Sequence, residues 1–225
     1  MKTSTKTIIV CAAVAAAVTL ASQAQAQNLL TDPGFEGQVA APNPNPNGVP
    51  GWANFGGAAF STTYSQSGSW SLYTPNNGGG YSVPGTYQDF AASPGETFTF
   101  SGWVFTPDAL VPNSNDFAIL QLSFFTGAPP NNYAGGTGVG TFGVNVGQPI
   151  GGGAVALPQG QWTFASVTAT APATTASIGA YILDINADAN SDFYFDNMIL
   201  TVPEPSALAL LGMGLAGTLI WRRRQ

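Results

Sequence analysis

Residues Thr97–Phe105, with the sequence TFTFSGWVF, decide the fold class. Successive side chains of a β-strand point to opposite faces, so the period-2 alternation of this segment predicts a half-buried or buried strand. The alternation places Phe98, Phe100 and Val104 on one face and leaves Trp103 and Phe105 on the other. Gly102 interrupts the apolar face, but the flanking aromatic and β-branched residues still favour a strand.

The same composition recurs along the chain. Further strands are expected at residues 55–64, 69–73, 117–125, 162–169, 176–185 and 193–202. The proline-rich residues 41–50 cannot form a central strand, and residues 126–160 are expected to form a long surface loop around short strands at 139–146. Residues 27–201 contain no convincing amphipathic helix, so they are predicted to form one all-β domain, a β-sandwich.

The amino-terminal 26 residues have the features of a signal peptide. Lys2 and Lys6 precede an apolar run at residues 8–20, and Ala24 and Ala26 provide the small residues that signal peptidase requires, so the exported chain is expected to start at Gln27. An uncleaved membrane anchor is the alternative. The single cysteine, Cys11, lies inside the apolar run, and the exported domain therefore has no thiol.

The carboxyl-terminal residues 202–225 combine three parts in order. Val202, Pro203, Glu204 and Pro205 come first, an apolar segment at about 206–221 follows, and residues 222–225 form a basic tail with Arg222, Arg223 and Arg224. The apolar segment predicts a transmembrane helix, and a buried helix of the domain is the alternative. All five basic residues of the chain lie in its two ends, where cytoplasmic charge is expected.

These three parts together closely resemble the PEP-CTERM sorting signal. The resemblance implies recognition by an exosortase, a membrane protease thought to cleave near the Pro-Glu-Pro motif, in a Gram-negative bacterium that produces exopolysaccharide. The helix would then hold the protein at the inner membrane only transiently, as in other removable anchors, before it reaches the cell envelope or extracellular matrix.

The composition of the exported residues excludes several functions. Residues 27–202 have no Lys, Arg or His but carry ten of the chain's eleven carboxylates, the other being Glu204. Nucleic-acid binding is not expected, because nothing neutralises phosphate. Catalysis by Ser-His-Asp or Cys-His is impossible without His or Cys. A glycosidase that uses two carboxylates is the remaining enzymatic alternative, with Glu36 and Glu96 as the only glutamates, and we expect a non-enzyme.

A second resemblance covers most of residues 28–201. The short motifs Asn28–Leu30, Gly34–Glu36, Gly51-Trp52, Ser67–Leu72, Tyr87-Gln88, Ser101–Val104 and Phe193–Asn197 are similar to those of jelly-roll carbohydrate-binding modules of the family 4/9/22 type. This resemblance implies a jelly-roll-like sandwich. It also implies a structural Ca²⁺ ion held by Glu36 and Asp196 with carbonyl groups of residues 66–69. The alternative is that both carboxylates are solvated or bonded to backbone amides.

Aromatic residues supply the candidate glycan-binding set. Tyr87, Trp103, Phe105 and Tyr181 are predicted to line a concave sheet face and to stack on sugar rings, although alternating aromatics are also typical of a core. Another acidic cluster, Asp184, Asp188 and Asp192, is interpreted as a solvated turn. The sequence therefore predicts a non-catalytic protein that binds a neutral polysaccharide or associates with exopolysaccharide. The alternative is a purely structural, glycosylated matrix or biofilm protein without a defined ligand.

Overall fold

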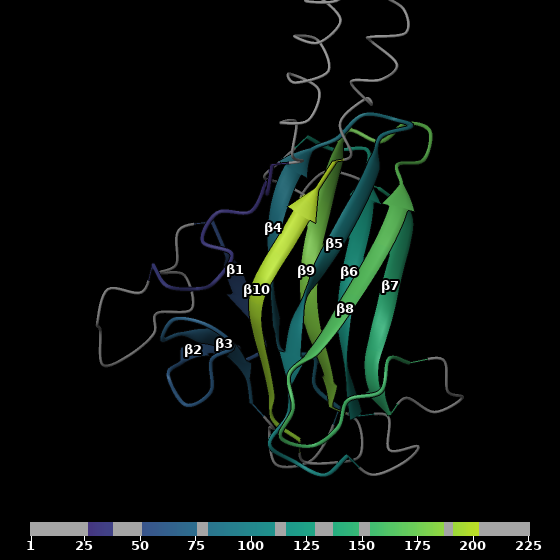
Figure 1. Cartoon of the computed structure of the whole chain (residues 1–225). Helices are drawn as coiled ribbons and strands as arrows, with labels where there is room; N and C mark the ends of the chain where they lie inside the picture. The colour runs from purple at the N-terminus through teal and green to yellow at the C-terminus, as the bar shows by residue number, and fades with distance from the viewer. Residues whose placement is uncertain are drawn as a thin grey trace, which may run out of the picture. The chain divides into compact units, whose positions relative to one another are not determined.

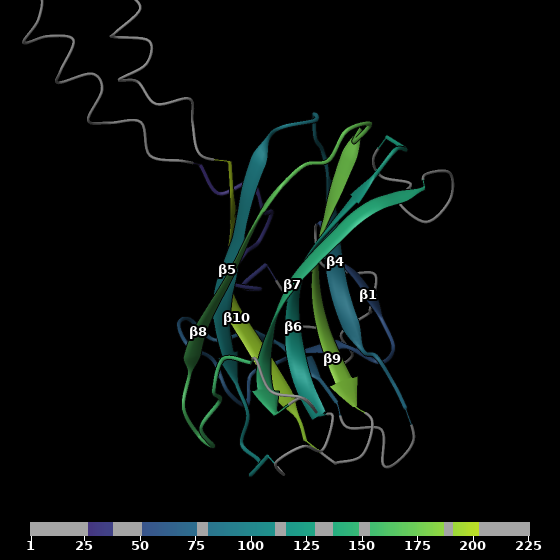
Figure 2. The same ribbon diagram turned by 90° about the vertical axis from the view of Figure 1, so that its right-hand side faces the viewer.

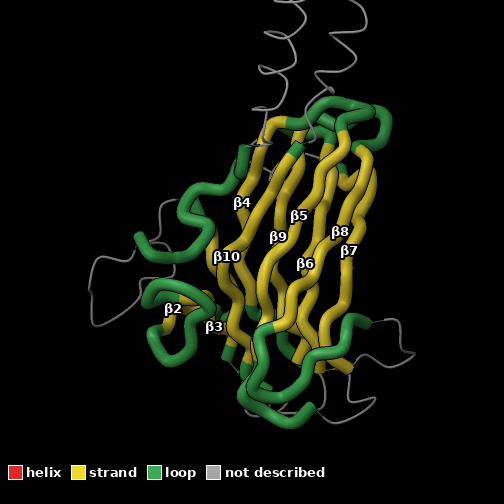
Figure 3. Tube along the Cα trace, in the orientation of Figure 1, coloured by secondary structure: helices red, strands yellow, loops and turns green. Residues whose placement is uncertain are grey.

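The computed structural model describes residues 27–37, 51–75, 81–110, 116–128, 137–148, 154–186 and 191–202. Residues 28–201 form one compact unit, and its described segments contain ten strands and no helix (Figures 1 and 3). Accordingly, no helix suited to crossing a membrane occurs among these residues. The predicted signal peptide, the Pro-Glu-Pro motif, the apolar segment and the arginines all lie outside the described residues.

The ten strands form two five-stranded sheets in which every strand pair is antiparallel. Sheet A has the order β1 (Ala53–Phe55), β4 (Gly85–Ala91), β9 (Ser177–Asn186), β6 (Asp116–Phe125) and β7 (Gly138–Gln148). Sheet B has the order β2 (Ala59–Ser61), β3 (Ser71–Thr74), β10 (Phe193–Thr201), β5 (Thr97–Phe105) and β8 (Thr163–Thr170). Figure 2 shows the two sheets facing each other, which confirms the predicted sandwich.

The core lies between the sheets and follows the predicted alternation. On β5, Phe98, Phe100 and Val104 are buried, and the Phe98 ring lies 6.1 Å from the ring of Phe124 on β6. Leu120 and Leu122 of β6 are also fully buried, because they share the inner face with Phe124. Burying these apolar side chains is the main source of stability in such a domain.

Most strand predictions are confirmed within two residues, and one is wrong. The expected strand at 55–64 is instead two short strands, β1 and β2, separated by a turn. Gly56 and Gly57 have positive φ values of 63° and 91° in that turn. A Cβ atom on Gly56 would lie 2.7 Å from the Cα atom of Pro84, so the backbone approach there requires glycine.

The first described residues run along β10 and fix the loops beside it. The Asn28 side chain donates to Met198 O (2.9 Å) and accepts from Leu200 N (2.9 Å). Strand β10 has a register shift between Asp196 and Ile199, and Asn197 takes a positive φ of 50° there. This bulge leaves the Asp196 side chain facing residues 66 and 67, away from the core.

Candidate functional site

The outer face of sheet A is concave. Figure 2 shows the ribbons of β6 and β9 curving toward sheet B at mid-length, so the backbone of sheet A is concave on the side that points away from sheet B. The register places one row of residues across the middle of this face: Ala53, Tyr87, Tyr181, Gln121 and Gly143. Directly opposite residues in an antiparallel sheet share a face, so these side chains are neighbours.

Two tyrosines occupy the centre of the row. The rings of Tyr87 and Tyr181 stack with centroids 5.0 Å apart and an interplanar angle of 22°. Tyr181 lies over Gly179, where a Cβ atom would come within 2.4 Å of its ring, and it is only 2% exposed. Tyr87 is half-buried, and its ring centroid lies 6.2 Å from that of Phe55. Tyr87 is therefore the more exposed ring of the pair, and Tyr181 packs against it.

Polar side chains border the tyrosine pair on the same face. Gln121 Nε2 donates to Ser123 Oγ (2.9 Å), and Ser123 Oγ lies 3.3 Å from Thr141 Oγ1. Asp89 follows Tyr87 by two residues on β4, and burial raises the pKa of its carboxyl from 3.8 to about 6. The face thus combines an aromatic centre with amide, hydroxyl and carboxylate groups.

The other two predicted glycan-binding residues lie on the opposite side of the sandwich. Trp103 and Phe105 belong to β5 and point outward from sheet B, so the expectation that all four aromatics share one face is wrong. The alternation within each strand was correct, but a strand pattern does not specify which sheet the strand joins. Trp103 contacts Phe164 (5.5 Å between ring centroids), and Phe164 is 48% exposed.

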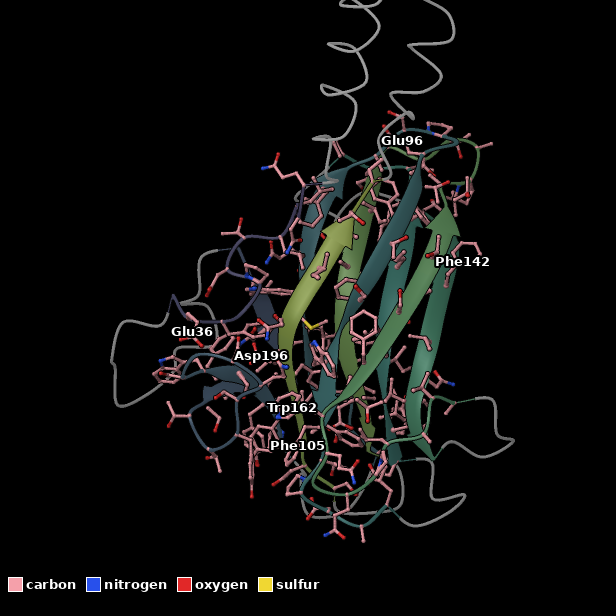
Figure 4. The ribbon with its side chains drawn as sticks, viewed as in Figure 1. Glu36, Glu96, Phe105, Phe142, Trp162 and Asp196 are labelled. Atoms are coloured by element: carbon pink, nitrogen blue, oxygen red, sulfur yellow. The ribbon has the colours of Figure 1, made fainter. Side chains whose placement is uncertain are left out.

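Phe105 belongs to an aromatic cluster on sheet B. Its ring contacts those of Tyr64, Trp162 and Tyr194 at 4.7–6.1 Å, and Figure 4 shows Phe105 beside Trp162. Burial raises the pKa of Tyr194 to about 12, and the negative charge of Asp192 acts in the same direction. Phe105 is itself buried, so it serves packing within the cluster.

The predicted acidic cluster at residues 184–192 is not a single solvated turn. Asp184 is fully buried on the inner face of β9, opposite Ala118, so that interpretation is wrong for this residue. Asp192 accepts from Tyr73 OH (3.1 Å), and its own backbone N–H donates to Asp108 Oδ2 (2.8 Å). Asp188 lies outside the described residues.

Glu36 and Asp196 both bind the loop at residues 66–70 (Figure 4). Asp196 Oδ2 accepts from the backbone amides of Gln66 (2.8 Å) and Ser67 (3.0 Å). Glu36 Oε1 accepts from the amides of Ser69 and Trp70, both at 2.8 Å. Asp196 is fully buried, and burial is the main cause that raises its pKa, whereas the three amide bonds it accepts lower it.

This arrangement fits the alternative of backbone-amide bonding better than the predicted Ca²⁺ site. Calcium takes six to eight oxygen ligands. Here five backbone N–H groups point at the two carboxylates, including that of Asn197, which donates to Asp196 Oδ1 (2.6 Å). The described residues contain no group of three acidic side chains that could hold a metal. Bound Ca²⁺ stays a prediction, and we derive no role from it.

The two glutamates of the domain do not form a pair. Figure 4 shows Glu96 at one end of the sandwich, far from Glu36. Glu96 Oε2 accepts from the Ser93 amide (2.7 Å) in the turn before β5, and Glu36 is bound to the loop at residues 66–70. The carboxylate separations used by glycosidases are about 5–10 Å across a shared site. These two glutamates therefore do not support the glycosidase alternative.

Comparisons with known proteins identify the sorting signal. The PEP-CTERM protein-sorting motif matches residues 201–224, so the chain carries this motif, as the sequence predicted. The motif implies export, processing by an exosortase and sorting to the cell surface. No curated protein sequence matches this chain.

Solved structures resemble the sandwich at low sequence identity. An arabinose-bound α-L-arabinofuranosidase, MgGH51, matches 78% of this chain with 26% of its own (16% identity, TM-score 0.50). A family 16 carbohydrate-binding module matches 64% of this chain with 84% of its own (17%, 0.44). The C-terminal family 22 module of Clostridium thermocellum Xyn10B matches 76% with 91% (18%, 0.42). At these identities the similarity concerns the fold alone.

Sequence reasoning missed several residues of the concave face. The sequence patterns assign no role to Gln121, Ser123 or Gly179. In the pairing of β6 with β9, Gln121 lies directly opposite Tyr181, and Ser123 lies directly opposite Gly179. This proximity is visible only once the pairing of the two strands is known. A single chain without known strand pairing does not reveal which of its alternating residues meet.

Proposed function

We propose that this protein is a non-catalytic glycan-binding protein of the cell envelope or extracellular matrix, delivered there by exosortase processing. The observation that carries the proposal is the Tyr87–Tyr181 pair at the centre of a concave face with polar side chains around it. Such a combination is typical of sites that bind a ligand with both apolar and hydroxyl surfaces.

The charge of the domain selects the class of ligand. The exported residues have no cation, so an acidic polysaccharide gains no electrostatic attraction and is repelled by ten carboxylates. A neutral polysaccharide avoids this repulsion. Its hydroxyl groups can exchange hydrogen bonds with Asp89, Gln121 and Thr141, which border the aromatic centre.

The tyrosine pair supplies the apolar contact. A pyranose ring has a flat C–H face, and an aromatic ring offers it a large apolar surface with defined orientation. Tyr87 is the ring that a sugar can reach, whereas buried Tyr181 holds Tyr87 in place through the 5.0 Å stack. The resemblance to carbohydrate-binding modules supports this proposal at the level of the fold.

Affinity electrophoresis in gels that contain neutral polysaccharides tests the proposal. We expect retention of the exported domain on at least one of them. Tyr87→Ala should weaken binding about tenfold, which corresponds to about 1.4 kcal/mol of lost contact. The matched control is Trp103→Ala, which removes an aromatic residue from the outer face of sheet B and should leave retention unchanged.

Two results would contradict the proposal. Retention that is lost in Trp103→Ala but kept in Tyr87→Ala would move the binding site to sheet B. Absence of retention on every neutral polysaccharide, with the fold intact by circular dichroism, would favour the alternative of a structural matrix protein without a defined ligand.

A further inference from the structure

Strand β7 is an edge strand of sheet A among the described residues. It pairs with β6 on one side, and on its other side Val155 bonds only to Asn145 O (2.8 Å) and Gly147 N (2.9 Å). Alternate residues of an antiparallel strand direct their backbone groups to the same side. Thr141 and Gly143 therefore direct theirs outward as well, and no strand among the described residues pairs with them there.

The edge lacks two of the features that normally prevent pairing, charge and proline. Natural edge strands are protected by charged residues, proline or strong bulges. The sequence of β7, GVGTFGVNVGQ, has no charge and no proline, and its one register irregularity lies at residues 138–140, before Thr141. Strand β8, the neighbouring edge of sheet B, has no charge either. Phe142 of β7 is labelled in Figure 4. Its side chain is 42% exposed, although its ring centroid lies 6.0 Å from that of Phe124.

The distribution of charge favours a second copy of this chain as the occupant. The exported domain carries ten carboxylates without a cation, so two copies repel each other in most orientations. No Asp, Glu, Lys, Arg or His occurs between Asp116 and Asp184, a stretch that contains β7 and β8. The β7 edge therefore lies on a side of the sandwich where two acidic copies can approach.

We propose that two copies pair antiparallel through β7 and form one continuous sheet. A twofold axis at Phe142 lets Thr141 and Gly143 of one copy exchange backbone hydrogen bonds with Gly143 and Thr141 of the other. Phe142 then lies directly opposite the Phe142 of the second copy, in the closer, non-hydrogen-bonded type of pair. The pairing covers the exposed Phe142 ring and joins the two concave faces edge to edge.

Cysteine cross-linking tests the register. The exported residues contain no cysteine, and Cβ atoms in such a pair lie about 4.5–5.5 Å apart, close to the range that a disulfide needs. Residues 27–202, which include the compact unit with its core, are suitable for the experiment. F142C should form a disulfide-linked dimer under mild oxidation. The control F164C, equally exposed but on the outer face of sheet B, should stay monomeric.

Two substitutions at Gly143 test the hydrogen bonds. Both G143P and G143A add a Cβ atom 3.1 Å from Ile119 Cγ2, but only proline removes the outward N–H. In sedimentation experiments we expect dimers for the original protein and G143A, and loss of the dimer for G143P with the melting temperature close to that of G143A.

Three outcomes would overturn the proposal. One is an original protein that stays monomeric at all concentrations. Another is equal cross-linking of F142C and F164C. The third is a monomer whose Thr141 and Gly143 amides are already protected from hydrogen exchange, because another segment of the same chain would then cover the edge. None of these measurements depends on glycan binding, so the proposed function can stand or fail separately.

Discussion

The outer faces of the two sheets carry similar residues and use them differently. On sheet A, Tyr87 and Tyr181 lie in a concave face with glycine at neighbouring positions. On sheet B, Tyr194 and Phe105 are packed beneath Tyr64 of the loop that follows β2. Each face also has a carboxylate, but Asp89 of sheet A is half-buried, whereas Asp196 of sheet B is fully buried under residues 66 and 67.

The difference shows that loops, more than strand composition, decide what a sheet face can do. Both sheets carry aromatic residues on their outer faces, yet the loops at residues 31–37 and 62–70 close over part of sheet B. These loops take their shape from backbone-amide bonds to Glu36 and Asp196. A face covered in this way contributes to stability.

The largest expected effect is the loss of stability in Asp196→Asn. The amide side chain keeps the size of the carboxylate but turns one acceptor into a donor that faces backbone N–H groups. Leaving buried donors unsatisfied costs about 1–3 kcal/mol each. We expect a free energy of unfolding about 3 kcal/mol lower and a melting temperature about 6–12 °C lower, measured by calorimetry.

The same measurement in calcium and in chelator sharpens this prediction. If backbone amides alone satisfy Asp196, the original protein should melt at the same temperature in both. A large decrease on chelation would show instead that an ion shares the two carboxylates. Glycan retention of the Asp196→Asn variant, measured below its melting temperature, should stay unchanged, because the proposed glycan site is on sheet A and Asp196 is on sheet B.

A smaller effect is expected for Gly179→Ala on sheet A, and this substitution should lower glycan affinity. The added Cβ atom would lie 2.4 Å from Cε2 of Tyr181, so the ring must move and the stack with Tyr87 changes. We expect glycan affinity about fivefold lower, equivalent to about 1 kcal/mol, in titration calorimetry.

Gly102→Ala is the matched substitution on sheet B. Its Cβ atom would lie 2.3 Å from Sδ of Met198, which is fully buried in the core. Overpacking of a core costs about 1–3 kcal/mol, so this variant should lose stability and keep its glycan affinity. If both glycine variants reduced affinity equally, the separation of roles between the two sheets would be wrong.

The sequence predicted most strands well because their signal is local, but its patterns did not predict β4 (Gly85–Ala91). The period-2 pattern of Thr97–Phe105 matches β5 in full, and those of β6, β8, β9 and β10 match within one residue at each end. The turn at Gly56 was missed because its cause, the close approach of Pro84, lies in a distant segment. The sequence also could not predict which strands pair with each other. This pairing places Trp103 and Phe105 in sheet B and Tyr87 and Tyr181 in sheet A.

The contact of Glu36 and Asp196 with the loop at residues 66–70 was predicted through a family resemblance. The resemblance correctly brought these three distant segments together. It did not predict the type of contact, because whether a loop presents carbonyl or N–H groups depends on its backbone dihedrals. Gly68 has a φ of 61°, and a Cβ atom there would lie 2.3 Å from Glu36 Oε1, so this local geometry orients the amides.

The smallest expected effect is on the pH dependence of stability, and it concerns Asp89. Burial raises the pKa of Asp89 from 3.8 to about 6 in the folded state. The folded protein therefore binds this proton more tightly than the unfolded chain, and the resulting stability is complete below about pH 4 and lost as the pH rises through about 6.

Asp89→Asn removes that dependence, because the amide stays neutral at every pH. Near pH 8 the variant should melt slightly above the original protein, and near pH 4 the two should melt alike, measured by thermal denaturation in parallel buffers. The same change of Asp to Asn thus stabilises sheet A and destabilises sheet B. A lower melting temperature for Asp89→Asn near pH 8 would show that the ionised Asp89 carboxylate is itself needed to hold the concave face.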